Sequence, residues 1–187
     1  NIKTPKIDLK VLTFAEEMRD VEKLQEIIWP GVSKIPAHFL VATAKNSGLV
    51  IGAYHQNEIV GFAFGVSAYH QFENGDVLPK HYSHMVGIHP EYQNAGIGYL
   101  LKKAQWKLIQ RMGIELITWT FDPLESRNGY LNISVLGGIC NTYQENIYGD
   151  MDDDLNSQLK SDRFELTWWL KSKRAKSRMQ STPIKRL

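Results

Sequence analysis

Strand-like and helix-like patterns alternate along the 187 residues, and this alternation predicts an α/β (α+β) fold. Two runs rich in β-branched and aromatic residues, 49–54 and 59–66, are separated by a polar tetrad, as in an antiparallel hairpin. Near the middle, the β-like run 81–88 leads through a loop into an amphipathic helical pattern, and residues 115–121 are again β-like. A strand, loop, helix, strand unit is therefore predicted at the centre of the chain.

Capping and turn residues define the other predicted elements. Thr13 and Glu16 have the Ser/Thr-x-x-Glu spacing that caps a helix start, and Pro36 suits the first position of a second helix. The predicted elements outside the central unit are a strand at 9–12, helices at 13–28, 36–46 and 126–136, a polar loop at 71–80, and a last strand at 164–170.

The composition is that of a folded protein in a reducing compartment. Hydrophobic residues make up 43% and charged residues 22% of the chain, and no apolar run is long enough to cross a membrane. Residues 1–6 are polar and lack the apolar core of a signal peptide. Cys140 is the single cysteine, so no internal disulfide forms and no structural zinc site is expected. We expect a cytoplasmic protein with no membrane contact and no bound metal.

The charge is unevenly distributed. Seven of the 22 lysines and arginines lie in residues 171–187, which contain no acid, so the other 15 face 20 acidic residues and give a net charge of −5. We therefore predict a single domain at residues 1–170 and a basic C-terminal tail at 171–187. Such a tail can bind nucleic acid, but a solvated tail that aids solubility is the commoner case, and nucleic acid receives little weight.

The most informative segment joins the end of the strand at 81–88 to the start of the following helix. It reads Ile88, His89, Pro90, Glu91, Tyr92, Gln93, Asn94, Ala95, Gly96, Ile97, Gly98. Free backbone N–H groups at a helix start, together with the positive end of the helix dipole, favour a phosphate group. Glycines let the phosphate oxygens approach, and neither a Rossmann nor a Walker glycine pattern is present.

This segment resembles the acetyl-coenzyme A signature of the GNAT superfamily, with Ile88 as the leading aliphatic residue and Gln93, Gly96 and Gly98 matching the motif. The order of elements is similar over about residues 8–170. The resemblance implies a mixed, mostly antiparallel, twisted sheet of six to seven strands flanked by about four helices, with a splay between strands 4 and 5. It also implies acetyl-coenzyme A as cosubstrate. The coenzyme-binding residues that it implies are Val86, Gly87, Ile88, Gln93, Asn94, Ala95, Gly96, Ile97, Gly98, Asn128 and Asn132. For Asn132 a helix-capping or structural role is the alternative.

A second group of residues is similar to a largely uncharacterised prokaryotic subgroup of the superfamily. It includes Asp122-Pro123-Leu124 and, further along, Leu136-Gly137. Many superfamily members carry a tyrosine near the coenzyme sulfur as general acid, and the matching position here is Ile133. The resemblance therefore gives the chemistry without the acceptor and leaves the general acid open.

Candidate catalytic residues follow from the needs of acyl transfer to an amine. Two-residue alternation places His84 on the same strand face as Val86 and Ile88, where a group with a pKa near 6.5 can act as base; a core or surface histidine is the alternative. Tyr143 and Tyr148 are candidate proton donors, with a role as core or lid aromatics as the alternative. Asp122 is a candidate amine recruiter, with a turn-forming role as its alternative.

Two other residue groups are weaker candidates. His81, His84 and His89 are close in sequence, but spacings of three and five do not bring all three onto one strand face as metal ligands. Cys140 is not needed as a nucleophile, since direct transfer forms no acyl-enzyme.

Three functions from different classes remain open at this stage. The first is an enzyme that moves an acyl group from coenzyme A to an amine-bearing acceptor, and for it we consider a homodimer alongside the monomer. The second is a non-catalytic coenzyme A sensor or interaction module. The third is a nucleic-acid-associated protein that uses the basic tail.

Overall fold

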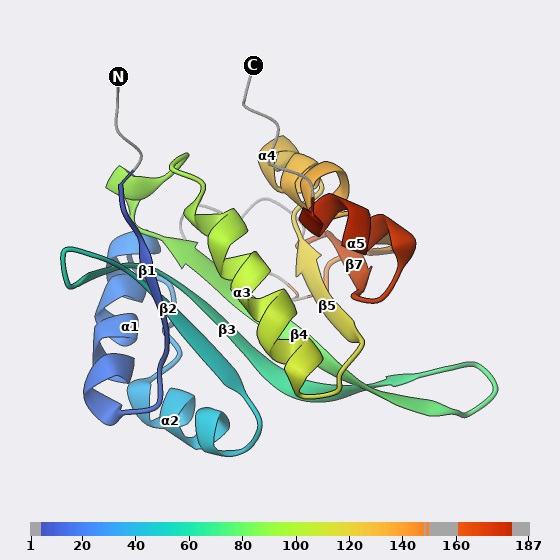
Figure 1. The fold of residues 1–187 in the computed structure, drawn as a ribbon, viewed down its shortest axis with the longest axis horizontal. Helices are drawn as coiled ribbons and strands as arrows, with labels where there is room; N and C mark the ends of the chain where they lie inside the picture. Colours follow the sequence, from blue (N-terminus) through green and yellow to red (C-terminus); the bar gives the residue numbers. More distant parts are fainter. Residues whose placement is uncertain (1–4, 148, 150–160, 181–187) are drawn as a thin grey trace. The chain divides into compact units, whose positions relative to one another are not determined.

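The computed structural model describes residues 5–147, 149 and 161–180, which form two units. The first unit holds most of strands β1 (Asp8–Val11), β2 (Leu49–His55), β3 (Glu58–Gln71) and β4 (Val77–Ile88), and helices α1 (Ala15–Ile28), α2 (Ala37–Lys45), η1 (Pro90–Tyr92) and α3 (Ile97–Arg111). The second unit holds β5 (Leu116–Phe121), α4 (Ser126–Gly129), η2 (Tyr130–Val135), β6 (Ile139–Gln144), β7 (Arg163–Trp169) and α5 (Lys173–Gln180), together with residues 69–81 (Figure 1).

The predicted fold class is confirmed. Neighbouring strands run β1-β2-β3-β4 in the first unit and β5-β7-β6 in the second, which makes seven strands among the described residues. The pairings β1 with β2, β2 with β3, β5 with β7 and β6 with β7 are all antiparallel. The predicted splay between strands 4 and 5 concerns the junction of the two units and stays a prediction, as does the single domain at 1–170.

The β2–β3 hairpin closes through a two-residue turn. Gln56 and Asn57 both have positive φ values, 51° and 68°, as a tight turn between twisted strands requires. The polar tetrad predicted as the loop is therefore shorter in the structure, because His55 and Glu58 pair as the last residues of the two strands.

The predicted cap of the first helix is wrong by one residue. Glu17, not Glu16, reaches back to the helix start, where its carboxylate accepts hydrogen bonds from the N–H groups of Thr13 and Phe14 at 2.9 and 3.0 Å. Glu17 also forms an ion pair with Lys10 of β1. The carboxylate therefore joins the helix start to the neighbouring strand.

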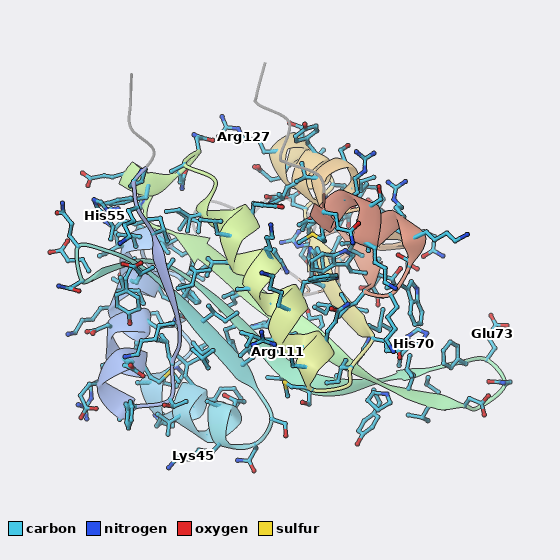
Figure 2. The ribbon with its side chains drawn as sticks, in the orientation of Figure 1. Lys45, His55, His70, Glu73, Arg111 and Arg127 are labelled. Atoms are coloured by element: carbon cyan, nitrogen blue, oxygen red, sulfur yellow. The ribbon has the colours of Figure 1, made fainter. Side chains whose placement is uncertain are left out.

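The predicted polar loop at 71–80 is shorter in the structure, where it spans residues 72–76. β3 continues to Gln71 and β4 begins at Val77, so most of that segment lies in a long hairpin that Figure 2 shows with Glu73 at its tip. Gly75, with φ 88°, turns the chain, and the Phe72 N–H donates to the Asp76 carbonyl at 2.9 Å. Strand pairing includes the predicted loop residues 77–80, because each strand satisfies the backbone groups of the other.

The core of the first unit lies between the strands and helices α1 and α2. Its fully buried side chains come from the β1 end, both helices, and strands β2 and β3: Leu12, Met18, Val21, Leu24, Leu40, Val50, Phe62 and Phe64. The apolar stripe of α1 that the sequence predicts thus packs against the strands, as an amphipathic helix must.

The second unit differs from the predicted helix at 126–136. α4 is short, and η2 continues it as a π-helix in which the Leu136 N–H donates to the Leu131 carbonyl at 2.9 Å. Trp168 of β7 is fully buried and donates its indole N–H to the Leu136 carbonyl at 2.9 Å. The indole therefore holds the end of η2 against β7.

The first part of the basic tail is helical. In α5, Ala175 and Met179 are buried, and the Arg174 side chain donates to the carbonyls of Gly137 and Ile133 at 3.2 and 2.9 Å. Residues 181–187 lie outside the described residues. In the described part of the chain, no helix is long and apolar enough to cross a membrane.

Candidate active site

The loop that follows β4 folds into a short, hydrogen-bonded lead into α3. η1 begins after His89, and Asn94 and Gly96 take left-handed backbone conformations with φ 66° and 81°. The Gly96 carbonyl accepts the first intrahelical bond, from the Leu100 N–H at 3.2 Å. The N–H groups of Ile97, Gly98 and Tyr99 therefore belong to the first turn, where a helix has no acceptor of its own.

The geometry at Gly96 fits a bound phosphate group. A Cβ built on Gly96 meets no heavy atom within 4 Å, so the space beside the loop is open. The positive φ also favours glycine over any residue with a side chain. The loop thus presents helix N-terminal N–H groups to open space, as a pyrophosphate site requires.

Packing holds the end of β4 against the start of α3. Gly61 of β3 lies between them, since a Cβ there would come within 2.9 Å of the Ile88 Cδ1 and 3.3 Å of the Ile97 Cγ2. The His89 N–H donates to the Val60 carbonyl at 2.9 Å. The strand end and the helix start, which the resemblance assigns to the coenzyme, therefore form one rigid corner of the first unit.

An aromatic cluster flanks this corner. The rings of His55 and His89 lie 5.6 and 5.8 Å from the ring of Tyr92, and Figure 2 shows His55 at the end of β2. His89 Nδ1 accepts a hydrogen bond from the Glu91 N–H at 3.3 Å, which stabilises the short helix η1. These contacts fix the chain just before Gln93.

Gly87, predicted as a coenzyme-binding residue, is buried and has a packing role. A Cβ there would lie 2.7 Å from Phe62, 2.8 Å from Ile28 and 3.0 Å from Trp29. Ile28 lies in the last turn of α1, and Trp29 follows it, so α1 lies directly over β4 at this point. Any contact of Gly87 with a coenzyme would involve its backbone.

The expected face of His84 is wrong, because side chains do not alternate strictly along β4. Ser83 points to α3, where its hydroxyl accepts a hydrogen bond from Lys102 at 2.8 Å, whereas Gly87 packs under α1. Residues four apart would share a face in a regular strand. The alternation therefore breaks between them, as it does at a β-bulge.

Ring contacts place His84 on the α1 and α2 side of the strand. Its ring lies 6.0 Å from the ring of Phe64, which belongs to the core under these helices, and Met85 packs against the same core. Ile88 instead faces Ile97 of α3. His84 is exposed, yet partial loss of water around the ring lowers the pKa of its imidazole, which favours the neutral form.

The connection between α1 and α2 is held by a buried amide. Gln25 accepts a hydrogen bond from the Ile35 N–H at 2.8 Å and donates one to the Ile35 carbonyl at 3.1 Å. Glu22 accepts one from the Ala37 N–H at 2.8 Å. Two side chains of α1 thus fix the far end of this loop.

The remaining predicted site residues lie in the second unit, which the structure describes separately. Asp122 has the turn-forming role given as its alternative, since its Oδ1 accepts from the Leu124 N–H at 2.8 Å. Asn128 is exposed on α4, and Asn132 is buried in η2. The Tyr143 hydroxyl donates to Asp162, and this hydrogen bond raises the pKa of the tyrosine. Tyr148 lies outside the described residues.

Sequence reasoning missed Lys102. The sequence predicts an apolar α3 stripe, and its members Ile97 and Leu101 are buried, but so are Lys102 and Gln105. The full predicted stripe is Ile97, Leu100, Leu101, Ala104 and Leu108. Lysine is rarely buried, so its residue type predicts an exposed position. A helical wheel centred on Ile97, Leu101 and Ile109 would have placed Lys102 at the edge of the buried face.

No group of three or more potential ligands gathers to hold a metal ion in the part of the chain that the structure describes. Cys140 lies in β6, and burial raises the pKa of its thiol, which disfavours the nucleophilic thiolate.

Comparison with known proteins matches this geometry to one family. The model of the "Acetyltransferase (GNAT) family" matches residues 16–128, which is more than half of the chain and includes the loop before α3. The chain belongs to the GNAT acetyltransferase family. No curated protein sequence matches it closely enough to name a relative.

Solved GNAT structures share the fold at low sequence identity. The ribosomal-protein-S18-alanine N-acetyltransferase from Escherichia coli is 13% identical with a TM-score of 0.68, and the match covers 88% of this chain and 94% of that one. The yncA protein of Salmonella typhimurium, a putative acetyltransferase with its cofactor acetyl-CoA, is 13% identical with a TM-score of 0.67, and the match covers 88% of this chain and 94% of that one. Arabidopsis thaliana NAA60 in complex with a bisubstrate analogue is 12% identical with a TM-score of 0.69, and the match covers 88% of this chain and 98% of that one. Family membership and coenzyme-bound structures of this fold support acyl transfer from coenzyme A.

Proposed function

We propose that this GNAT protein transfers an acetyl or related acyl group from acyl-coenzyme A to an amine by direct transfer in a ternary complex. The observation that carries the proposal is the loop at Gly96, which offers open space and helix N-terminal N–H groups beside the end of β4. The loop residues Gln93 to Gly98 would hold the pyrophosphate, and the backbone at Val86 and Ile88 would bond the pantetheine arm.

The reaction needs few side chains. The neutral amine attacks the thioester carbonyl, the carbon–sulfur bond of the tetrahedral intermediate breaks, and the thiolate takes a proton as the amine loses one. A backbone N–H of β4 near the carbonyl would stabilise the oxyanion, and positioning supplies much of the rate. His84 is our candidate base, and Tyr143, whose raised pKa keeps it protonated, is our candidate proton donor.

The acceptor class that we propose to test first is a peptide amine. One GNAT structure of this fold is an alanine N-acetyltransferase for a ribosomal protein, and another, Arabidopsis thaliana Naa50, is in complex with the bisubstrate analogue CoA-Ac-MVNAL. In our proposal the acceptor approaches past the α1–α2 connection held by Gln25. A panel of peptides and small amines with acetyl-coenzyme A measures the preference.

Coenzyme binding tests the proposal directly. We expect acetyl-coenzyme A to raise the melting temperature, because a ligand that binds only the folded state stabilises it, whereas NADH and ATP should have little effect. Calorimetry gives the affinity for coenzyme A. No binding at millimolar coenzyme A would show that the assignment is wrong.

A non-catalytic coenzyme A sensor is the second candidate, favoured by Ile133 at the position of the customary acid. Binding of acetyl-coenzyme A without turnover on any amine of the panel would support the sensor. Transfer to any amine would support the enzyme.

If His84 is the base, then His84→Ala should lower turnover chiefly near neutral pH. The loss should shrink at high pH, where the acceptor amine deprotonates unaided. Rates measured across the pH range test this, with His38→Ala, an exposed histidine of α2, as the control. A His84→Ala profile parallel to that of the wild type would remove His84 from the mechanism.

A further inference from the structure

β1 is an edge strand whose outer side has no partner strand in the part of the chain that the structure describes. It stands first in the strand order and pairs with β2, which lies next to it in Figure 1. All four of its residues are exposed, including the large apolar side chains of Leu9 and Val11 at 38% and 42%. An open edge of this kind offers its backbone groups to another strand.

The hydrogen bonds of the β1–β2 pair show which backbone groups face outward. Directly after β1, the Leu12 N–H donates to the Val50 carbonyl at 2.9 Å, in the same register as the strand. In an antiparallel pair, residues that bond the partner strand alternate with residues whose backbone groups point away from it. The N–H and C=O groups of Leu9 and Val11 therefore face the open edge.

The same alternation extends to the residues before β1. The imidazole of His55, at the end of β2, donates to the Lys6 carbonyl at 3.1 Å, so the backbone of Lys6 points toward β2. Ile7 is the next residue, and its backbone groups then point outward like those of Leu9. Three alternate residues thus line the open edge.

The side chains on the two faces of β1 differ in polarity. Lys10 forms an ion pair with Glu17 of α1, which places Lys10 on the α1 face, and Asp8 shares that face by two-residue alternation. Leu9 and Val11 lie on the opposite face. β1 is therefore charged on one face and apolar on the other.

We propose that the open edge of β1 pairs with β1 of a second copy of this chain, antiparallel and with Leu9 opposite Leu9. In this register the two Leu9 residues exchange two N–H to C=O hydrogen bonds. Asp8 of each copy lies opposite Lys10 of the other copy. This interface goes beyond the proposed function, because it requires no coenzyme and no acceptor.

Charge selects this register from its neighbours. Outward-facing residues must oppose each other, so a shift of the second strand sets Leu9 against either Val11 or Ile7. The first shift places Lys10 opposite Lys10, and the second places Asp8 opposite Asp8. Like charges directly opposite each other destabilise a strand pair, whereas opposite charges stabilise it. The register with Leu9 opposite Leu9 brings opposite charges together twice.

Both faces of the proposed strand pair are complementary. Asp8 and Lys10 occupy positions without backbone hydrogen bonds, where opposed Cα atoms approach to about 4.5 Å and side chains lie closest. On the other face, Leu9 meets Leu9 and Val11 meets Ile7, so exposed apolar side chains cover one another. The pair therefore joins charge to charge and apolar surface to apolar surface.

The edge of β1 lacks the usual features that prevent strands from pairing. Residues 7–12 contain no proline, and the β1–β2 register runs without a bulge. A lysine on an edge strand is another such feature, but Lys10 already has Glu17 as its counter-charge. The edge is therefore open to a second strand.

Sedimentation equilibrium of the full chain over a range of concentrations measures the association. The wild type should reach twice the mass of one chain. Asp8→Lys should raise the dissociation constant of the dimer at least about tenfold, because both cross-strand pairs change from opposite to like charges. Glu73→Lys is the matched control, since it makes the same charge change at the exposed tip of the β3–β4 hairpin (Figure 2) and should leave association unchanged.

Leu9→Pro tests the backbone edge and spares the β1–β2 hydrogen bonds. Proline lacks the N–H that Leu9 would donate to the second copy, and edge strands tolerate proline where this group faces outward. The variant should remain monomeric, while circular dichroism and thermal denaturation show that it is folded.

Disulfide cross-linking tests the register. In a Cys140→Ser background, a mixture of Asp8→Cys and Lys10→Cys chains should cross-link readily, because these positions oppose each other at about 4.5 Å between Cα atoms. Either variant alone should cross-link poorly. The same residue in the two copies is displaced by two positions along the strands, which separates its Cα atoms by about 8 Å and exceeds the reach of a disulfide.

Three results would overturn this inference. The first is a wild type that stays monomeric at the highest concentration at which it is soluble. The second is a dimer whose dissociation constant is unchanged in folded Asp8→Lys or Leu9→Pro protein. The third is equal cross-linking of the mixture and of the separate cysteine variants. Coenzyme A binding tests the proposed function alone, so the two conclusions can fail independently.

Discussion

Gly98→Glu should lower the affinity for coenzyme A at least about a hundredfold, which is about 2.8 kcal/mol. Gly98 lies in the first turn of α3, directly after Gly96 and Ile97, where its N–H has no helical acceptor. A glutamate side chain there would occupy space that the pyrophosphate needs and would bring a negative charge close to the phosphate oxygens. Isothermal calorimetry with coenzyme A measures the loss.

The fold should survive this change, because a carboxylate in the first turn interacts favourably with the helix dipole. Circular dichroism and thermal denaturation check that point before the affinity is compared. Gly98→Gln is the matched control, since it adds nearly the same bulk without the charge and should lose less affinity than Gly98→Glu. Near-normal affinity of a folded Gly98→Glu protein would place the phosphate site elsewhere in the chain.

Trp168→Ala should destabilise the protein by about 3–5 kcal/mol, as truncation of a large buried aromatic residue does. Trp168 is fully buried, its ring lies 5.8 Å from that of Trp119, and its indole N–H donates to the Leu136 carbonyl. The variant leaves a cavity in the second unit and leaves this carbonyl without its indole partner. Urea denaturation gives the change in the free energy of unfolding.

Trp169→Ala is the control for this prediction. The neighbouring indole is only partly buried and contacts His70 with ring centres 6.5 Å apart, so its removal should cost clearly less. Trp168→Phe keeps a buried six-membered aromatic ring but loses the five-membered ring with its N–H, so it should cost less than Trp168→Ala. Equal costs for Trp168→Ala and Trp169→Ala would contradict the packing that the structure shows.

The sequence predicted the elements whose signals are local. The helix start at Ile97 follows from the change of period after Pro90, and the hairpin of β2 and β3 follows from two β-rich runs around Gln56 and Asn57. The loop residues from Gln93 to Gly98 were found because glycine spacing and a helix start lie next to each other in the chain. Each of these signals depends on residues within a few positions of one another.

Other features depended on partners distant in sequence. The polar loop predicted at 71–80 is confined to residues 72–76 at the tip of the β3–β4 hairpin, since strand pairing extends through residues 77–80, which include Pro79. His84 faces Phe64 rather than the side of Ile88, because alternation breaks near Ser83. The residue types along β4 do not indicate where the alternation of side chains breaks.

The fold class and the candidate phosphate loop can therefore be predicted from the sequence alone, because backbone preference, hydrophobic periodicity and glycine spacing act within one segment. The burial of Lys102 and the side of β4 on which His84 lies were decided only when α1, α2 and α3 packed on the strands. Packing sets the dielectric around a side chain and the neighbours that it meets, and these two quantities determine whether an amine near neutral pH is charged.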